Sequence, residues 1–204
     1  MMDNLFGNLF ASEQKQTKPL ADRMRPERLS DFVGQESAVG VGSPLRRMIE
    51  RDALQSVLFY GPPGTGKTTL AQVIAHVTGE KFVSINAVSS GVPELRKLIA
   101  KAQDDRRAGM GRTIVFIDEI HRFSKSQQDS LLGAVERGVV TLIGATTENP
   151  SFEVIRPLLS RCQLYVLKSL DKDDLLELLQ RAITTDTELS KRHIELKQTD
   201  AMLR

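Results

Sequence analysis

The sequence predicts an α/β protein in which a parallel five-stranded sheet is sandwiched by helices. Short runs of β-branched and aromatic residues, each too short for a helix, alternate with longer stretches whose apolar residues recur at helical spacing. One of these runs leads directly into a glycine-rich loop, and another ends in two carboxylates. Strands that alternate with helices form parallel sheets, and such sheets bind ligands beyond the carboxyl ends of their strands.

The composition is that of an ordinary globular protein. Of the 204 residues, 40% are hydrophobic and 26% are charged, and the net charge of +2 is too small to require a polyanionic partner. No apolar stretch approaches the length of a membrane span, and residues 1–10 lack the basic start and apolar core of a signal peptide. The single cysteine, Cys162, excludes an internal disulfide. We therefore expect a cytoplasmic protein without a membrane partner.

Residues 1–18 are predicted to form a flexible arm. Two Leu-Phe pairs, Leu5-Phe6 and Leu9-Phe10, lie in this polar segment. They could dock into a partner's groove such as the pocket of a sliding clamp, but an arm that packs loosely on its own domain or stays disordered is the simpler interpretation. Ser43 then caps a helix that starts at Pro44 and closes near Ala53.

The first strand, residues 56–60, is followed by the pattern G-x-x-x-x-G-K-[ST], filled by Gly61, Pro62, Pro63, Gly64, Thr65, Gly66, Lys67 and Thr68. A helix with Gly79 as its C-cap follows. Backbone without Cβ atoms can curl around a triphosphate and aim successive N–H groups at it, and the helix adds its positive dipole end. The Lys67 ammonium would reach the outer phosphates, the Thr68 hydroxyl would bind Mg²⁺, and Thr69 would complete the phosphate-binding segment. A chance match is disfavoured because strand, loop and helix all agree with the pattern.

A second strand is expected at residues 81–87, and a helix begins at Pro93. The apolar strand that follows, residues 113–117, delivers Asp118 and Glu119 at its carboxyl end. Asp118 would orient the Mg²⁺ shell, and Glu119 would be the base that polarises the attacking water. An ordinary strand end with solvated acids is the alternative, and the preceding phosphate-binding loop disfavours it.

The linker 121–128 leads to a helix capped by Ser124 and Gln127 and ended by Gly138. Its basic residues could touch DNA, but a solvated loop is the simpler interpretation. His121 is interpreted as a hydrogen-bonding neighbour of Glu119 and not as a metal ligand, because one histidine makes no complete ligand set.

The next strand, residues 139–147, ends in the hydroxyls of Thr146 and Thr147, either of which could bond the γ-phosphate or the water. Residues 152–159 are predicted to form one short helix. Arg161 then precedes the last strand, residues 163–167, and an acid-rich helix start follows at Asp171.

Together these elements resemble the AAA+ ATPase core, with Walker A on the first strand and Walker B on the third. Several strings between about Pro19 and Ala182 resemble the replication-associated recombination protein A family (RarA or MgsA), which is related to clamp loaders. They are Arg23-Met24-Arg25-Pro26 with Val33-Gly34-Gln35, Asp118-Glu119-Ile120-His121-Arg122-Phe123, the run from Gly144 to Glu153, and Leu158-Leu159-Ser160-Arg161.

The resemblance implies an Mg²⁺-dependent ATPase that remodels DNA or DNA-bound proteins at stalled or damaged replication forks. It implies an adenine pocket lined by Arg25, Pro26, Val33 and Gly34, with Thr146 or Thr147 as sensor 1. It also implies that Arg161 is an arginine finger reaching a neighbouring subunit's ATP. The implied partners are single-stranded DNA ends or forks, single-strand-binding protein, and further copies of the chain in a homo-oligomer, with a sliding clamp as a further candidate. The implied location is nucleoid-associated.

The resemblance also predicts the domain organisation. Residues 19–168 would form the nucleotide-binding domain and 169–204 the beginning of a helical lid. The family continues through a complete lid with a sensor 2 arginine into an oligomerisation domain, so the chain resembles an N-terminal fragment, for which we expect weak ATPase activity. The alternatives are a clamp-loader or branch-migration motor subunit, and a nucleotide-switched binding module without turnover.

Overall fold

The computed structural model describes residues 19–87, 90–192 and 194, and the predicted arm at 1–18 lies outside them. The chain divides into two compact units. Among the described residues, the first unit spans 27–87 and 90–170, and the second combines 19–26 with 171–192 and 194. No helix among the described residues is both long and apolar enough to cross a membrane.

The first unit is built on a parallel sheet of five strands in the order β2-β3-β4-β1-β5. This sheet confirms the predicted fold class. Its strands are β1 (Val57–Tyr60), β2 (Lys81–Asn86), β3 (Thr113–Asp118), β4 (Val140–Thr146) and β5 (Gln163–Val166). The central strand β4 is buried along its whole length, as expected of a parallel strand covered on both faces.

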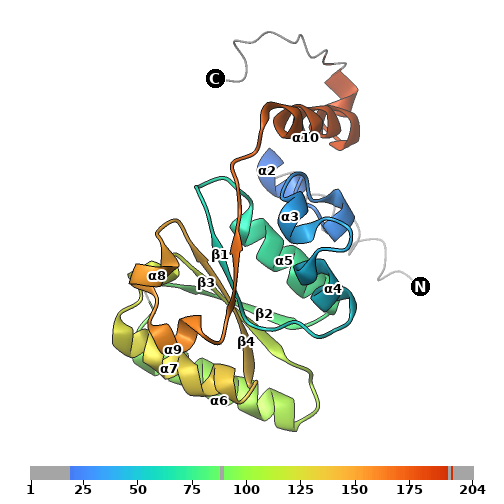
Figure 1. The fold of residues 1–204 in the computed structure, drawn as a ribbon. Coiled ribbons are helices and arrows are strands. Elements are labelled where there is room, and N and C mark those ends of the chain that lie inside the picture. Colours follow the sequence, from blue (N-terminus) through green and yellow to red (C-terminus); the bar gives the residue numbers. More distant parts are fainter. Residues whose placement is uncertain (1–18, 88–89, 193, 195–204) are drawn as a thin grey trace, which may run out of the picture. The chain divides into compact units, whose positions relative to one another are not determined.

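Alternate residues of the strands feed two hydrophobic cores, one on each face of the sheet. Phe59 and Phe116 pack with residues of the helices that follow Ser43 and Gly66. Their strand neighbours Leu58 and Val115 pack with the helices on the other face. Figure 1 shows this layering, with α4 and α5 on one face and α6 and α7 on the other. The helices of this unit are α3 (Glu36–Val39), α4 (Pro44–Glu50), α5 (Lys67–Thr78), α6 (Val92–Arg107), α7 (Lys125–Glu136), α8 (Pro150–Glu153) and α9 (Arg156–Leu159), with 3-10 turns η1 (Leu29–Asp31) and η2 (Ile120–Arg122).

The predicted single helix at residues 152–159 is wrong, because the chain forms α8 and α9 with an extended break at Val154 and Ile155. Pro157 has no N–H with which to continue the hydrogen-bond ladder back to Glu153. The buried side chain of Gln128 on α7 takes over instead. Its Nε2 donates to the Glu153 carbonyl (3.0 Å), and its Oε1 accepts from the Ile155 N–H (2.9 Å).

The second unit contains α2 (Leu20–Arg23), α10 (Lys172–Thr185) and the turn η3 (Ser190–Arg192). Asp171 opens α10 with a capping box completed by Asp174, in agreement with the predicted acid-rich helix start. Arg23 donates from Nε to Asp186 Oδ2 (2.7 Å) and from Nη2 to Oδ1 (3.0 Å). Residues 19–26 lie in the same compact unit as the segment after 170, whereas the predicted nucleotide-binding domain includes them. The domain boundaries remain a prediction.

Candidate functional site

The glycine-rich loop joins β1 to α5, as predicted. Gly64 and Gly66 adopt the left-handed backbone conformation, with φ of 77° and 88°, which other residues seldom adopt. Gly61 is required for a different reason, because a Cβ at this position would lie 2.2 Å from the Leu167 carbonyl oxygen at the end of β5. The loop therefore has the curled backbone that the pattern predicts, and Gly61 in addition lets it lie close to Leu167.

The Lys67 side chain is folded into this loop. Only 7% of the residue is exposed, and its Nζ donates to the carbonyls of Gly61 (2.7 Å) and Pro62 (2.8 Å). Thr65 also donates to the Pro62 carbonyl (3.0 Å). Burial lowers the pKa of the Lys67 ammonium, while the carboxylates of Glu119 and Asp118 act in the opposite direction. The lysine thus lies within the electrostatic reach of both acids.

Asp118 joins the two motifs. Its Oδ2 accepts a hydrogen bond from the Thr68 hydroxyl at 3.3 Å, and its Oδ1 accepts from the Glu119 N–H at 3.1 Å. A hydroxyl and a carboxylate are oxygen donors of the kind Mg²⁺ prefers, and this ion usually takes one or two protein ligands together with phosphate and water. No group of three or more His, Cys, Asp or Glu side chains within the described residues could hold a metal alone. The donor set fits an ion that is shared with a phosphate.

Glu119 lies at the start of a small polar network. Its backbone has a positive φ of 52°, and its Oε2 lies 3.1 Å from His121 Nδ1 and 3.4 Å from the Thr147 hydroxyl. Thr146, fully buried at the end of β4, is 3.0 Å from the same histidine nitrogen. His121 thus contacts Glu119, as its interpretation as a hydrogen-bonding neighbour requires. Both candidate sensor threonines contact the same network.

The segment before the loop is also fixed near the site. The Phe32 ring packs against Gly66, where a Cβ would lie 2.8 Å from Cζ. Val33 is buried, Gly34 has a φ of 71°, and Gln35 pairs its side-chain amide with the Lys168 backbone at 2.6 and 2.9 Å. Of the predicted adenine-pocket residues, Val33 and Gly34 therefore adjoin a residue that touches the loop.

The other two adenine-pocket candidates belong to the second unit. There Arg25 donates from Nη2 to Asp22 Oδ1 (2.7 Å), and Pro26 follows it directly. The adenine pocket as a whole remains a prediction.

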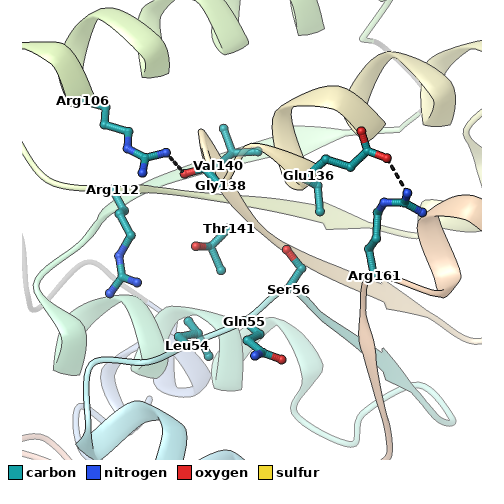
Figure 2. A pocket seen from close by; sticks show the side chains of 11 residues that line it. Leu54, Gln55, Ser56, Arg106, Arg112, Glu136, Gly138, Val140, Thr141 and Arg161 are labelled. Carbon is teal, nitrogen blue, oxygen red and sulfur yellow. Dashed lines mark hydrogen bonds and ion pairs between the residues drawn. The ribbon is translucent and has the colours of Figure 1, made fainter.

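Arg161 lies elsewhere in the first unit. It borders a pocket of about 510 Å³ whose walls include Ser56, Val140 and Thr141, which lie at the amino ends of the strands (Figure 2). Its Nη2 is ion-paired with Glu136, the last residue of α7, and its Nη1 donates to the Pro157 carbonyl at 2.6 Å. The Gln163 N–H bonds the Ser56 carbonyl at the start of β1, whereas the glycine-rich loop follows the end of β1. Arg161 therefore lies near the amino ends of the strands, and the loop lies at their carboxyl ends.

Sequence reasoning missed three polar residues that shape these surroundings. Gln35 ties the segment 32–35 to the end of β5, Gln128 orders the chain between α8 and α9, and Glu136 holds Arg161. A glutamine on an otherwise apolar helix face was the only available signal for Gln128. For Gln35 and Glu136 the partners are 133 and 25 residues away, and no local pattern indicates them.

Comparison with known proteins identifies the fold family. Residues 57–170 match the "ATPase family associated with various cellular activities (AAA)". The chain belongs to the AAA family. Among solved structures it is similar to the RuvB Holliday junction branch migration motor of Thermotoga maritima, with a TM-score of 0.66 and 30% identity over 85% of this chain and 56% of that one.

Several relatives carry the name indicated by the sequence strings. Replication-associated recombination protein A of Escherichia coli K12 is 52% identical over 170 residues, and that of Bacillus subtilis is 37% identical over 166. These matches cover 83% and 81% of this AAA chain, which spans about 38% of the length of each relative. ATPase WRNIP1 of Dictyostelium discoideum is 44% identical over 95% of the chain, which spans 22% of its length. The resemblance to the RarA family is confirmed.

Proposed function

We propose that the chain is an Mg²⁺-dependent ATPase that acts on DNA or on DNA-bound proteins at stalled or damaged replication forks. The observation that carries the proposal is the meeting of Thr68 and Asp118 at 3.3 Å, beyond the carboxyl ends of β1 and β3. Two motifs 50 residues apart are thereby joined at the edge where parallel sheets bind ligands. The names of the relatives support the setting in replication and recombination.

Triphosphate binding is assigned to the loop and the first turn of α5, residues 61–69. Lys67 must leave the Gly61 and Pro62 carbonyls and turn its ammonium to the outer phosphates. Thr68 and Asp118 would hold Mg²⁺, whose positive charge would offset the negative charge on the transferred phosphoryl group. Asp118 would orient that ion, and Val33 and Gly34 are assigned to the adenine.

Hydrolysis is assigned to Glu119 as the base. Its carboxylate takes a proton from the attacking water as the water oxygen bonds the γ-phosphorus and the bond to the ADP oxygen breaks. Thr146 or Thr147 acts as sensor 1. Of the two, Thr147 donates directly to the Glu119 carboxylate, while the Thr146 hydroxyl is buried among Glu148 and His121.

Arg161 is assigned to the neighbouring subunit's ATP. Because β1 has four residues, its amino and carboxyl ends lie about 13 Å apart. This distance places the Arg161 guanidinium out of reach of the loop of the same chain. An arginine that reaches developing phosphoryl charge in trans accelerates hydrolysis strongly. Complete turnover thus requires a homo-oligomer.

The proposed partners are single-stranded DNA ends or forks and single-strand-binding protein, with a sliding clamp as a further candidate. Two exposed basic residues, Arg122 at the end of η2 and Lys125 at the start of α7, are candidates for phosphate contacts. Assays of clamp loading onto primed DNA and of branch migration would distinguish this activity from those of the related motor proteins.

The experiment that tests the proposal replaces Glu119 by Gln. ATP affinity should stay within about twofold, while phosphate release should fall by at least about 100-fold, because the base is lost and the phosphate grip is not. Fluorescent-nucleotide binding and phosphate release are the measurements. Glu153→Gln, an exposed acid on α8, is the matched control and should behave as the unaltered chain. Full turnover in Glu119→Gln would contradict the assigned base.

A second candidate function is a nucleotide-switched binding module without turnover. The observation that favours it is the position of Arg161, because this arginine of a single copy does not serve as the finger at its own site. Partner binding that responds equally to ATP and to a non-hydrolysable analogue, without phosphate release, would support this alternative.

A further inference from the structure

His121 is the residue through which the end of β3 contacts the end of β4. It lies in η2, directly after Glu119, and only 16% of its side chain is exposed. Its Nδ1 is 3.1 Å from Glu119 Oε2 and 3.0 Å from Thr146 Oγ1. One ring nitrogen therefore bridges the proposed base and a candidate sensor.

The donors and acceptors of this network assign the hydrogen on His121. An ionised carboxylate only accepts, so a nitrogen at 3.1 Å from Oε2 carries a hydrogen. The Thr146 hydroxyl donates to the Glu148 carbonyl (3.2 Å) and accepts from the Glu148 N–H (3.0 Å), which leaves one acceptor position for His121. The Nδ1–H is thus shared between Glu119 Oε2 and the Thr146 hydroxyl.

The backbone holds the histidine in this place. Glu119 adopts a left-handed backbone conformation that residues with a Cβ seldom adopt, and its carbonyl accepts the Arg122 N–H at 2.8 Å. Ile120 and Phe123, both buried, anchor the turn on either side. The ring is thereby presented to the carboxylate by a rigid segment.

We propose that His121 is a positioning residue that holds the Glu119 carboxylate beside the two threonines at the end of β4. Together with the Thr147 hydroxyl it bonds the single oxygen Oε2, while Oε1 takes no part in these two bonds. One carboxylate oxygen is thus held in place, and Oε1 is the oxygen that we assign to the attacking water. This inference rests on the proposed role of Glu119 as base.

The test compares His121→Asn, which keeps a side-chain N–H, with His121→Leu, which removes it. We expect kcat for ATP to fall about 10- to 100-fold in His121→Leu, with KM and nucleotide affinity within about twofold, because a misplaced base affects the chemical step alone. His121→Asn should recover at least about a third of the unaltered kcat. His76→Ala, an exposed histidine on α5, is the matched control and should change neither constant.

Two outcomes would overturn the inference: an unchanged kcat in His121→Leu, or equal losses in the Asn and Leu variants. Thermal unfolding is followed for each variant, and if His121→Leu lacks a folding transition, His121→Ala replaces it in the comparison. Glu119→Gln is measured in parallel. Full turnover in that variant would refute the proposed base, whereas an inactive Glu119→Gln beside a fully active His121→Leu would refute the positioning role alone.

Discussion

At the scale of single residues, the site depends on small groups that let backbone segments approach. Gly61 is the clearest case, because it lies against the Leu167 carbonyl without adopting a positive φ. The requirement is therefore steric. The motif pattern predicts a glycine here, but the reason for it becomes visible only when β5 is placed next to β1.

Gly61→Ala should lower the free energy of unfolding by about 1–3 kcal/mol and weaken nucleotide binding, since the new Cβ forces the loop away from Leu167. Denaturant unfolding and nucleotide titration are the measurements. Gly91→Ala is the control, because its nearest contact would be an ordinary 3.4 Å from Pro93. Equal stability of the two variants would contradict this explanation.

The residue scale also shows the limits of reading motifs. Spacing and strand ends predicted Lys67, Thr68, Asp118 and Glu119 together, because the carboxyl ends of parallel strands converge. Spacing could not separate Thr146 from Thr147, since both follow the same strand. Only the side-chain contacts distinguish them: Thr146 faces the interior, and Thr147 faces Glu119.

At the scale of elements, buried polar side chains determine where helices end, and Gln128 on α7 is the clearest example. Gln128 is 1% exposed and also donates to the Phe123 carbonyl at 3.1 Å, so a single amide satisfies three backbone groups. This arrangement keeps α8 and α9 separate. Helical periodicity over residues 152–159 gave no indication of it, because the cause lies on α7.

Gln128→Leu should destabilise the first unit by about 3 kcal/mol, because it leaves buried N–H and C=O groups without partners. Chemical denaturation followed by circular dichroism measures the loss. The neighbouring exposed residue supplies a control, Asp129→Ala, which should change stability by less than about 0.5 kcal/mol. A Gln128→Leu chain as stable as this control would show that the three bonds add little.

The ion pair of the second unit predicts a pH dependence. The Arg23 guanidinium, together with the Leu189 and Glu188 N–H groups, lowers the pKa of Asp186 to about 2. A carboxyl whose folded pKa lies below its ordinary value stabilises the fold above about pH 4, and this contribution is lost as the pH falls towards 2. In an NMR titration, the chemical shifts of the Asp186 carboxyl carbon and of the Arg23 Nε–H should therefore change together below pH 4. Asp186→Asn should abolish the shared transition, and Asp173→Asn, an exposed acid on α10, should leave it unchanged.

At the scale of the whole molecule, the sheet separates the nucleotide loop from the arginine. The fold class followed from the alternation of strands and helices, and residues 27–170 form the predicted sheet. The grouping of residues 19–26 with the segment after 170 did not follow from the sequence, because a long-range ion pair, Arg23 with Asp186, joins them.

If Arg161 acts in trans, two inactive variants should complement each other. Arg161→Ala lacks the finger and Glu119→Gln lacks the base, but in a mixed oligomer some interfaces combine an intact base with an intact finger. Phosphate release by the mixture should exceed the sum of the separate rates and rise with protein concentration. Glu153→Gln mixed with Arg161→Ala serves as the reference. A monomer, verified by light scattering, whose turnover needs Arg161 would contradict action in trans.

Because the glycine-rich loop and Arg161 lie at opposite ends of the strands, the number of complete ATP sites depends on how the subunits assemble. If Arg161 of each subunit contacts the loop of the next subunit, the subunits form a head-to-tail series. Such a series either closes into a ring or remains open. In a closed ring every pocket would be completed by its neighbour. In an open assembly, the ATP site of the subunit at one end would have no neighbouring Arg161. The Arg161 of the subunit at the other end would contact no ATP. The number of active ATP sites per assembly, measured from the burst of product in a single turnover, would therefore distinguish a closed ring from an open assembly.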